Sequence, residues 1–401
     1  MAKVNTVAPY DRPQDVNVLM TVLHPQPIQG LGNILLLNFT GSGNSQDAGK
    51  SDTGKSQDTG AQDKDQKTPS AQKPALPDDL SNQDRLNGLL FRKADKDTGA
   101  IYREYVNLDA VAVDYPEGTT AYNKASAYFA QDNHSDRIAI LDLDKSKMLD
   151  SLKAFWFFNW TFAVCVDNTI DDTTVQLANI FEANKNKFLV LQTNDLSDYT
   201  QLFGQNYTIG LKHDLSECMD AAFVGNIATL PVGSITWKFK PLKGITAETL
   251  TTTELAGINR VHAIAYEEMM GRGQTSEGRT LSGEYIDLLH GVMWVQTTAE
   301  SRLETLLQTS GKIPYEEKGI NMIVATLTQV MNEAYNRQII MTNPDTGRGM
   351  FSITATPRSA QSRDDLSNRH YGGVSFEYHA SSAIHTIVVN GSVDSDTIMA
   401  A

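Results

Sequence analysis

The stretch from Arg137 to Gln192, RIAILDLDKSKMLDSLKAFWFFNWTFAVCVDNTIDDTTVQLANIFEANKNKFLVLQ, decides the fold class. Its three short apolar runs are separated by two longer amphipathic segments. This pattern predicts strands at 138–143, 161–166 and 188–192, with helices at 145–157 and 171–185 between them. Strands that alternate with helices are joined by right-handed crossovers and form a mostly parallel sheet. The stretch therefore predicts a mixed α/β body.

The flanking sequence adds further elements to this body. Before the stretch we expect strands at 34–39 and 102–106 and a helix at 121–130. After it we expect strands at 207–211 and 261–266, a turn at 271–280, long helices at 283–309 and 316–340, and strands at 350–355 and 374–378. The predicted organisation is an N-terminal part of the body (31–136), an α/β portion (137–245) and a C-terminal domain with the helix pair and a sheet (246–382). The fold class is thus mixed α/β and α+β.

Each end of the chain carries a short strand-like arm, predicted at 1–30 and 383–401. Apolar residues alternate with mostly polar ones in the first arm, and a β-branched run marks the second. A strand at a free terminus exposes unpaired backbone groups, so it tends to join a sheet edge, here in another copy of the chain. The candidate subunit-interface residues are Val16, Val18, Met20, Val22, Ile384, Thr386, Ile387, Val388 and Val389.

A polar low-complexity insertion interrupts the N-terminal part of the body. Residues 41–77 contain almost no large apolar side chain, and SQDAGKSDTGKSQDTGAQDKDQK resembles a decayed duplication of a short polar unit. Such a segment buries too little surface to offset its ordering entropy. We expect a surface insertion, with a decorating or adhesive loop as the functional alternative.

Composition narrows the classes of function. The 401-residue chain has a formal net charge of −14, which argues against a nucleic-acid partner. Cys165 and Cys218 have no metal-binding spacing, which favours a reduced intracellular folding environment. The first residues, Met1 to Pro13, lack the apolar core of a signal peptide. The most apolar run, 154–166, is shorter than the roughly 20 residues that span a bilayer, so no membrane insertion is expected.

Motifs for catalysis are largely missing from the sequence. The glycine cluster at Gly271, Gly273 and Gly278 lacks the Gly-Lys-Ser/Thr ending of a phosphate loop, and a tight turn is the simpler interpretation. Asp142 and Asp144 share one side of a strand, where a magnesium role is the alternative to solvated strand-end residues. We therefore assign no catalytic, cofactor-binding or metal-binding residues.

A second hypothesis places an enzyme or ligand-binding protein on the parallel sheet. It predicts a polar cleft at the carboxyl ends of the strands, near Asp142, Asp167 and Asn194. In that case the terminal segments would pack on their own body instead of on a neighbour.

The C-terminal half resembles the sheath proteins of contractile bacteriophage tails. SGEYIDLLHGVMWVQTTAESRLETLLQTSGKIPYEEKGINMIVATLTQVMNEAYNRQII (282–340) carries the order of elements, SSAIHTIVVNGSV (381–393) resembles the last strand and linking arm of the family, and 105–111 with 121–125 resembles its pre-core segment. The motifs are a Gly-x-x-Trp step at Gly291 and Trp294, a Lys-Ile-Pro-Tyr hinge at 312–315, a Gly-Ile helix start at 319–320 and a closing apolar turn at 339–340. The 41–77 insertion departs from the family pattern.

The resemblance implies a structural, non-enzymatic sheath subunit without a cofactor. Such subunits form stacked hexameric rings, or an equivalent six-start helix, around a tail tube, and their terminal arms add strands to sheets of neighbouring subunits. The implied partners are further copies of the chain, the tail tube protein, and the baseplate and tail terminator proteins. The implied location is a virion assembled in the bacterial host cytoplasm. A headless contractile particle, or another virion tail component, stays open as an alternative.

Overall fold

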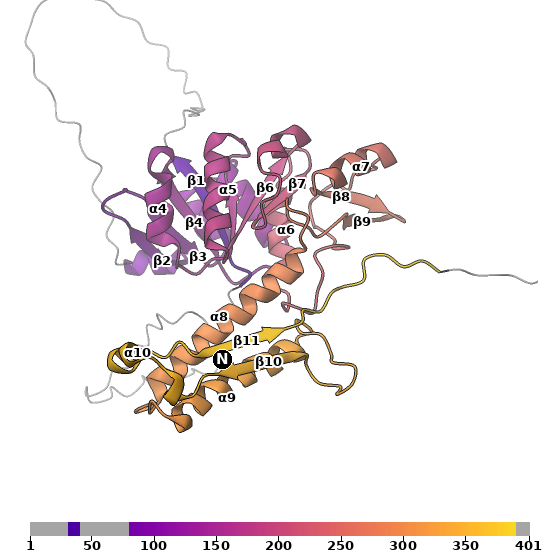
Figure 1. Cartoon of the computed structure of the whole chain (residues 1–401). Coiled ribbons are helices and arrows are strands. Elements are labelled where there is room, and N and C mark those ends of the chain that lie inside the picture. The colour runs from indigo at the N-terminus through magenta and orange to yellow at the C-terminus, as the bar shows by residue number, and fades with distance from the viewer. Residues whose placement is uncertain (1–30, 41–79, 390–401) are drawn as a thin grey trace, which may run out of the picture.

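The computed structural model describes residues 31–40 and 80–389 (Figure 1). In this part of the chain the strands form a nine-stranded sheet in the order β2-β3-β4-β1-β5-β6-β7-β8-β9 and a two-stranded sheet of β10 and β11. The strands are β1 (Ile34–Thr40), β2 (Leu89–Ala94), β3 (Ile101–Tyr105), β4 (Ile138–Asp144), β5 (Phe162–Cys165), β6 (Phe188–Thr193), β7 (Thr208–Lys212), β8 (Ile264–Met269), β9 (Arg272–Thr275), β10 (Phe351–Ala355) and β11 (Val374–Tyr378).

The middle of the large sheet is parallel. Strands β4, β1, β5, β6, β7 and β8 follow one another in parallel, while β2, β3 and β9 add antiparallel edges. β1 lies at the centre, where Leu36 pairs with Ile140 of β4 on one side and Val164 of β5 on the other. These three side chains are fully buried, as expected for a parallel sheet covered on both faces. The predicted mixed, mostly parallel α/β architecture is confirmed.

Helices cover both faces of this sheet. α4 and α5 lie on the face toward the viewer in Figure 1, whereas α3 packs against α6 on the opposite face. The α-helices are α1 (Asn82–Leu86), α2 (Leu108–Asp114), α3 (Thr120–Phe129), α4 (Met148–Phe155), α5 (Asp172–Asn184), α6 (Met219–Ile227), α7 (Thr252–Arg260), α8 (Ile286–Thr309), α9 (Glu317–Asn336) and α10 (Arg363–Asn368). The start of α5 is fixed by a capping box between Asp171 and Thr174.

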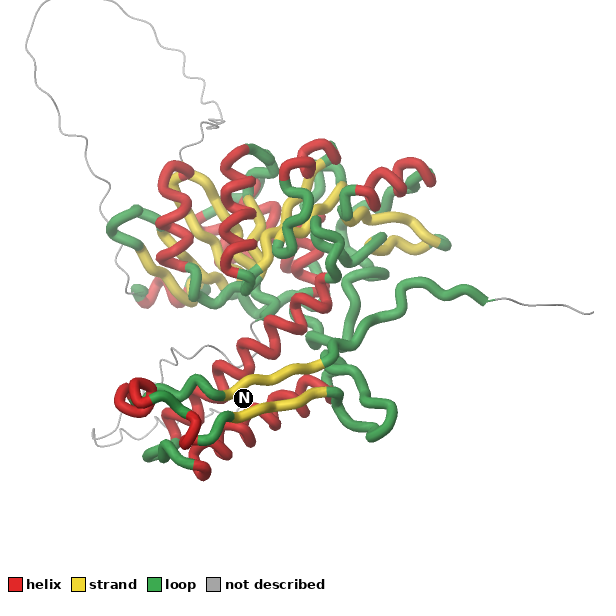
Figure 2. Tube along the Cα trace, in the orientation of Figure 1, coloured by secondary structure: helices red, strands yellow, loops and turns green. Residues whose placement is uncertain are grey.

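The helix pair α8 and α9 builds a second hydrophobic cluster with the small sheet. α8 extends from beneath the large sheet into this second layer, where β10 and β11 lie across the helix pair (Figures 1 and 2). Trp294, Leu327 and Met331 form its centre, and Phe351 and Tyr378 from the small sheet pack against it. The predicted pair of long helices followed by two strands is confirmed.

Several details differ from the expectations. The helix expected at 145–157 is a 3-10 turn at Lys145–Lys147 followed by α4, because the Asp144 side chain caps the turn. The strand expected at 261–266 is β8, which pairs in parallel with β7 and so belongs to the large sheet. α7 was not predicted, although Thr251 and Glu254 form a capping box at its start.

A buried lysine lies at the amino end of β6. The Lys187 ammonium donates hydrogen bonds to the main-chain oxygens of Trp160 and Phe158, and its Nζ lies 3.9 Å from the centroid of the Trp160 ring. Burial lowers the pKa of Lys187 to about 7. The folded protein therefore releases this proton at a pH about three units lower than an unfolded chain does, in which lysine titrates near pH 10.4.

We expect Lys187→Met to remove a pH dependence of stability. Between about pH 7 and 10 the unfolded state binds one more proton than the folded state at this residue, so Lys187 alone contributes a rise in the free energy of unfolding of about 1.4 kcal/mol per pH unit. Urea unfolding followed across this range should show a slope that is lower by about this amount in the variant. Lys153→Met, on the exposed side of α4, is the control. Equal slopes for the unchanged protein and Lys187→Met would contradict the assignment.

Candidate functional site

The carboxyl edge of the parallel strands is the first place to look for a ligand site. Asp142, at the end of β4, accepts hydrogen bonds from Asn38 Nδ2 at 2.7 Å and Tyr115 OH at 2.8 Å and forms an ion pair with Arg103. Its carboxylate is therefore committed to holding β1, β3 and β4 together. Asp144 caps the following turn, so these two acids stabilise the strand ends.

The cavities at this edge are too small for a substrate. The space among Phe39, Lys145, Cys165 and Asp171 is about 20 Å³, and the neighbouring space beside Asp167 has no room for a water molecule. A volume of 20 Å³ holds about one water, whereas small-molecule pockets span roughly 300–1,000 Å³. Neither space beside Asp167 offers the cleft that the enzyme hypothesis required near Asp142, Asp167 and Asn194.

A buried ion pair closes the same edge on the other face. Lys124 of α3 and Asp220 of α6 are both almost fully buried and contact each other directly. The Lys124 ammonium also donates to Asn168 Oδ1 at 2.7 Å, and the main-chain amide of Asp220 donates to Gln192 Oε1 at 3.1 Å. Because its charges are matched and hydrogen-bonded, this cluster fixes α3 against α6 and the strand ends.

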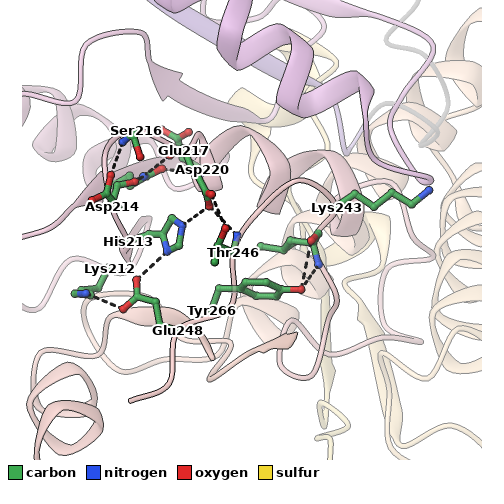
Figure 3. A network of polar contacts seen from close by, with 12 residues as sticks. Lys212, His213, Asp214, Ser216, Glu217, Asp220, Lys243, Thr246, Glu248 and Tyr266 are labelled. Carbon is green, nitrogen blue, oxygen red and sulfur yellow. Dashed lines mark hydrogen bonds and ion pairs between the residues drawn. The ribbon is translucent and has the colours of Figure 1, made fainter. Parts of the chain in front are cut away.

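A second polar network surrounds His213 at the end of β7 (Figure 3). Nδ1 lies 2.9 Å from Glu248 Oε1 and Nε2 lies 2.8 Å from Glu217 Oε2, so both ring nitrogens face carboxylates. Thr246 donates two further hydrogen bonds to Glu217, and Lys212 pairs with Glu248 at 2.9 Å. Burial opposes ionisation of Glu217, yet the hydrogen bonds from Thr246 and His213 hold its pKa below the usual range.

The His213 network holds separate segments of the fold together. It ties the end of β7 to the loop before α6 and to the segment that bridges to β8 through Glu248 and Glu267. In residues 31–40 and 80–389 no group of three or more His, Cys, Asp or Glu side chains is placed to hold a metal ion. The network therefore cross-links the fold where β7 and β8 share only a short ladder.

A large apolar groove lies between the helix pair and the small sheet. Its volume is about 840 Å³, and its walls come from α8, α9, the 313–315 turn and β11. The apolar side chains that line it include Val295, Leu303, Leu306, Leu307, Ile313, Ile320, Ile323, Val374, Phe376 and Tyr378. The sequence showed an apolar face on each helix, but not that parts of both faces border an open groove.

The predicted arm residues are only partly within the described structure. Val16, Val18, Met20 and Val22 lie outside it. Residues 384–389 form an extended segment that leaves β11 and the start of α8 without belonging to a strand (Figure 2). Ile384 and Val389 are 77% and 84% exposed, and Thr386, Ile387 and Val388 are exposed as well. The apolar side chains of this segment are therefore available to another chain.

The described helices give no candidate membrane span, since none combines the length and apolar character needed to cross a bilayer. The sequence matches no protein-family model and no curated protein.

Solved structures match the fold over nearly its whole length. A chain from the cryo-EM structure of the anti-feeding prophage baseplate, 6-fold symmetrised, has a TM-score of 0.60 at 12% identity. The contracted sheath complex of the extracellular contractile injection system PVC gives 0.59 at 9%, and the contracted helical sheath of the anti-feeding prophage gives 0.57 at 13%. Each match covers 98% of this chain and 99–100% of the other. The chain has the fold of contractile-injection-system sheath proteins, which confirms the sequence resemblance at the level of the fold.

Proposed function

We propose that this chain is the structural subunit of a contractile sheath. The observation that carries the proposal is the match to two contracted sheath structures over 98% of the chain. Copies of the subunit polymerise as stacked hexameric rings, or an equivalent six-start helix, around an inner tube. One of the matched assemblies is itself described as 6-fold symmetrised, which supports this symmetry.

The proposed partners follow from that assembly. Further copies of the chain form the array, a tail tube protein fills its centre, and baseplate and tail terminator proteins close its two ends. The subunit acts without catalysis, nucleic acid or membrane insertion, as part of a phage tail or a phage-tail-like particle. Contraction of the array drives the tube through the envelope of the target cell.

Residues 1–30 and 383–401 are proposed to link neighbouring subunits by strand addition. Support comes from the exposed apolar residues at 384 and 387–389 and from the small sheet, in which β11 pairs only with β10 among the described residues. β11 also lines the apolar groove, so a strand added beside it would lay its side chains over that groove. Between the two arms, the proposed parts of the body are its N-terminal part (31–136), the α/β portion (137–245) and the C-terminal domain (246–382).

The energetics of such links suit an array that must rearrange without breaking. Each backbone hydrogen bond contributes about 0.5–1.5 kcal/mol net, and full burial of a Val or Ile side chain adds about 1.5–3 kcal/mol. Several such contacts on each of two arms give a strong multivalent connection while the rigid bodies between them stay free to slide. Head-to-tail contacts that do not close on themselves generate a helical polymer.

The energy for contraction is proposed to be stored during assembly. An extended array that is kinetically trapped can convert to a more stable contracted array when one end is triggered. The subunit then needs no fuel site, and the cavities of about 20 Å³ or less at the carboxyl edge of the parallel strands are consistent with this. They also weigh against the alternative of an α/β enzyme or ligand-binding protein.

Truncation after Ser382 should abolish polymerisation and leave a folded, soluble body. The removed residues contribute no strand to the described fold, whereas they carry the exposed apolar run. Circular dichroism should match the full chain, thermal unfolding should stay cooperative with a slightly lower midpoint because the contacts of His385 are lost, and electron microscopy should show no tubes. Normal tubes from the truncated protein would contradict the role of this arm.

A single substitution on β11 should weaken assembly through the groove. Phe376 lines the groove, whereas its neighbour Glu377 does not. Phe376→Ser should raise the protein concentration needed for polymerisation about tenfold or more, because it removes part of the apolar surface that the arm covers. Sedimentation of assembled particles over a concentration series measures this.

The matched control for that experiment is Glu377→Ser on the same strand. It should polymerise like the unchanged protein. Equal concentration thresholds for Phe376→Ser and Glu377→Ser, with both variants folded, would show that the groove takes no part in assembly.

A further inference from the structure

Both ends of the described chain converge on the start of α8. At the N-terminal end, the main-chain oxygen of Leu31 accepts a hydrogen bond from His290 Nε2 at 3.0 Å. Leu31 belongs to the second hydrophobic cluster together with Val232 and Trp294. His290 is fully buried, and burial lowers its pKa to about 4, so the ring stays neutral while it donates this bond.

At the C-terminal end, a different histidine holds the chain to the same region. His385 Nε2 lies 2.8 Å from the Thr236 hydroxyl oxygen. The ring packs edge-on against Tyr285, the residue that precedes α8, with centroids 5.0 Å apart and an interplanar angle of 89°. The Phe239 ring also lies beside it, with the two ring centroids 6.1 Å apart. The His385 side chain is only 10% exposed, in contrast to 77% for Ile384 and 79% for Ile387.

The charges around His385 complete its pocket. Glu277 Oε2 lies 3.7 Å from Nδ1, and both atoms are buried without a hydrogen-bond partner within the described structure. Lys238 and Arg279 flank Glu277, and Asp287 faces the ring from the first turn of α8. The Thr236 hydroxyl also hydrogen-bonds the Asp287 carboxylate. The pocket thus offers the ring a hydroxyl at Nε2 and a carboxylate 3.7 Å from Nδ1.

The segment around His385 has few other contacts with the body. Its last backbone tie before the histidine is the hydrogen bond from Ser381 N to Ile339 O at 2.9 Å. Between these two points, residues 381–383 line a cavity of about 810 Å³, and Ser382 and Ala383 are exposed. The direction in which residues 386–389 leave the body is therefore set by one side chain.

We propose that His385 is a positioning residue that anchors the root of the C-terminal arm, so that residues 387–389 are presented outward in a fixed direction. The inference rests on the proposed function, because it explains how an arm is made ready for a neighbouring subunit. An arm that is already oriented loses less conformational entropy when it pairs, which strengthens assembly without any added contact. His290, which binds Leu31, lies five residues after Tyr285, which contacts His385. Tension on either arm therefore reaches the same helix.

The anchor is tested in the unassembled full-length protein. Spin labels at Val389→Cys and Asp150→Cys, in a Cys218→Ala background, report the distance between the arm and α4. We expect a narrow distance distribution for the parent protein and a broad one for His385→Ala and for Thr236→Ala. Thr236 lies in the body and contacts the arm at His385. Thr386→Ala, which leaves the pocket unchanged, is the control and should keep the narrow distribution.

Assembly is measured separately on unlabelled proteins. Loss of an interaction of hydrogen-bond strength that preorganises an arm should raise the concentration threshold for polymerisation about 3- to 10-fold in both His385→Ala and Thr236→Ala. A distribution for the parent protein as broad as that of His385→Ala overturns the anchor, whatever the assembly result. Broadening in both variants without a change in threshold overturns its role in assembly.

The two measurements also separate this inference from the proposed function. If the parent protein forms no polymer under any condition, the proposed function fails. The label distances still decide whether His385 holds the arm.

Discussion

The burial of β1 between β4 and β5 is the constraint on which the rest of the structure depends. β1 is the first described strand, yet it lies at the centre of the large sheet, with its residues from Ile34 to Leu37 fully buried. The chain reaches this position past Gly32, where a Cβ atom would come within 2.5 Å of the main chain at Ala228. Because β1 enters the sheet from this side, Leu31 lies against α8 in the second hydrophobic cluster, while Ile34 already belongs to the first.

The large sheet has the strand order of a ligand-binding fold, but its described residues leave little space at the usual binding position. In the order β4-β1-β5-β6-β7, the chain adds β4 on one side of β1 and then β5, β6 and β7 on the other side. In such sheets a ligand occupies the crevice outside the carboxyl ends of the strands, at the point where the strand order switches sides. Here the Lys145–Asp171 ion pair lies in that crevice and leaves about 20 Å³. The Lys124–Asp220 pair and the His213 network close neighbouring parts of the sheet with polar contacts between its elements. Function therefore has to be argued from the surfaces of this fold and not from its architecture.

Local patterns in the sequence predicted the elements well. Continuous apolar runs identified the central strands, and the helical stripes identified α8 and α9, because burial of one face imposes a period on the chain. Elements with weaker patterns were missed. β2 pairs only at the edge of the sheet, and α7 is short, with Ile258 as its one buried residue. The site was harder to predict: the groove combines segments between Val292 and Tyr378, and His385 meets Thr236 from 149 residues away, and no local pattern encodes such distances.

The sequence by itself determined the α/β class, the helix pair and the absence of the usual catalytic motifs. These are properties of single segments, and they follow from hydrophobic periodicity and residue chemistry. The tertiary structure alone decided that β1 lies between β4 and β5 and that the Lys145–Asp171 ion pair lies in the crevice of the sheet. It also decided that His290 contacts Leu31 and His385 contacts Thr236, so that both ends of the described chain lie beside the start of α8. The physical reason is that pairing and packing choose among distant segments of similar apolar character, and only the complete set of contacts determines which of them meet.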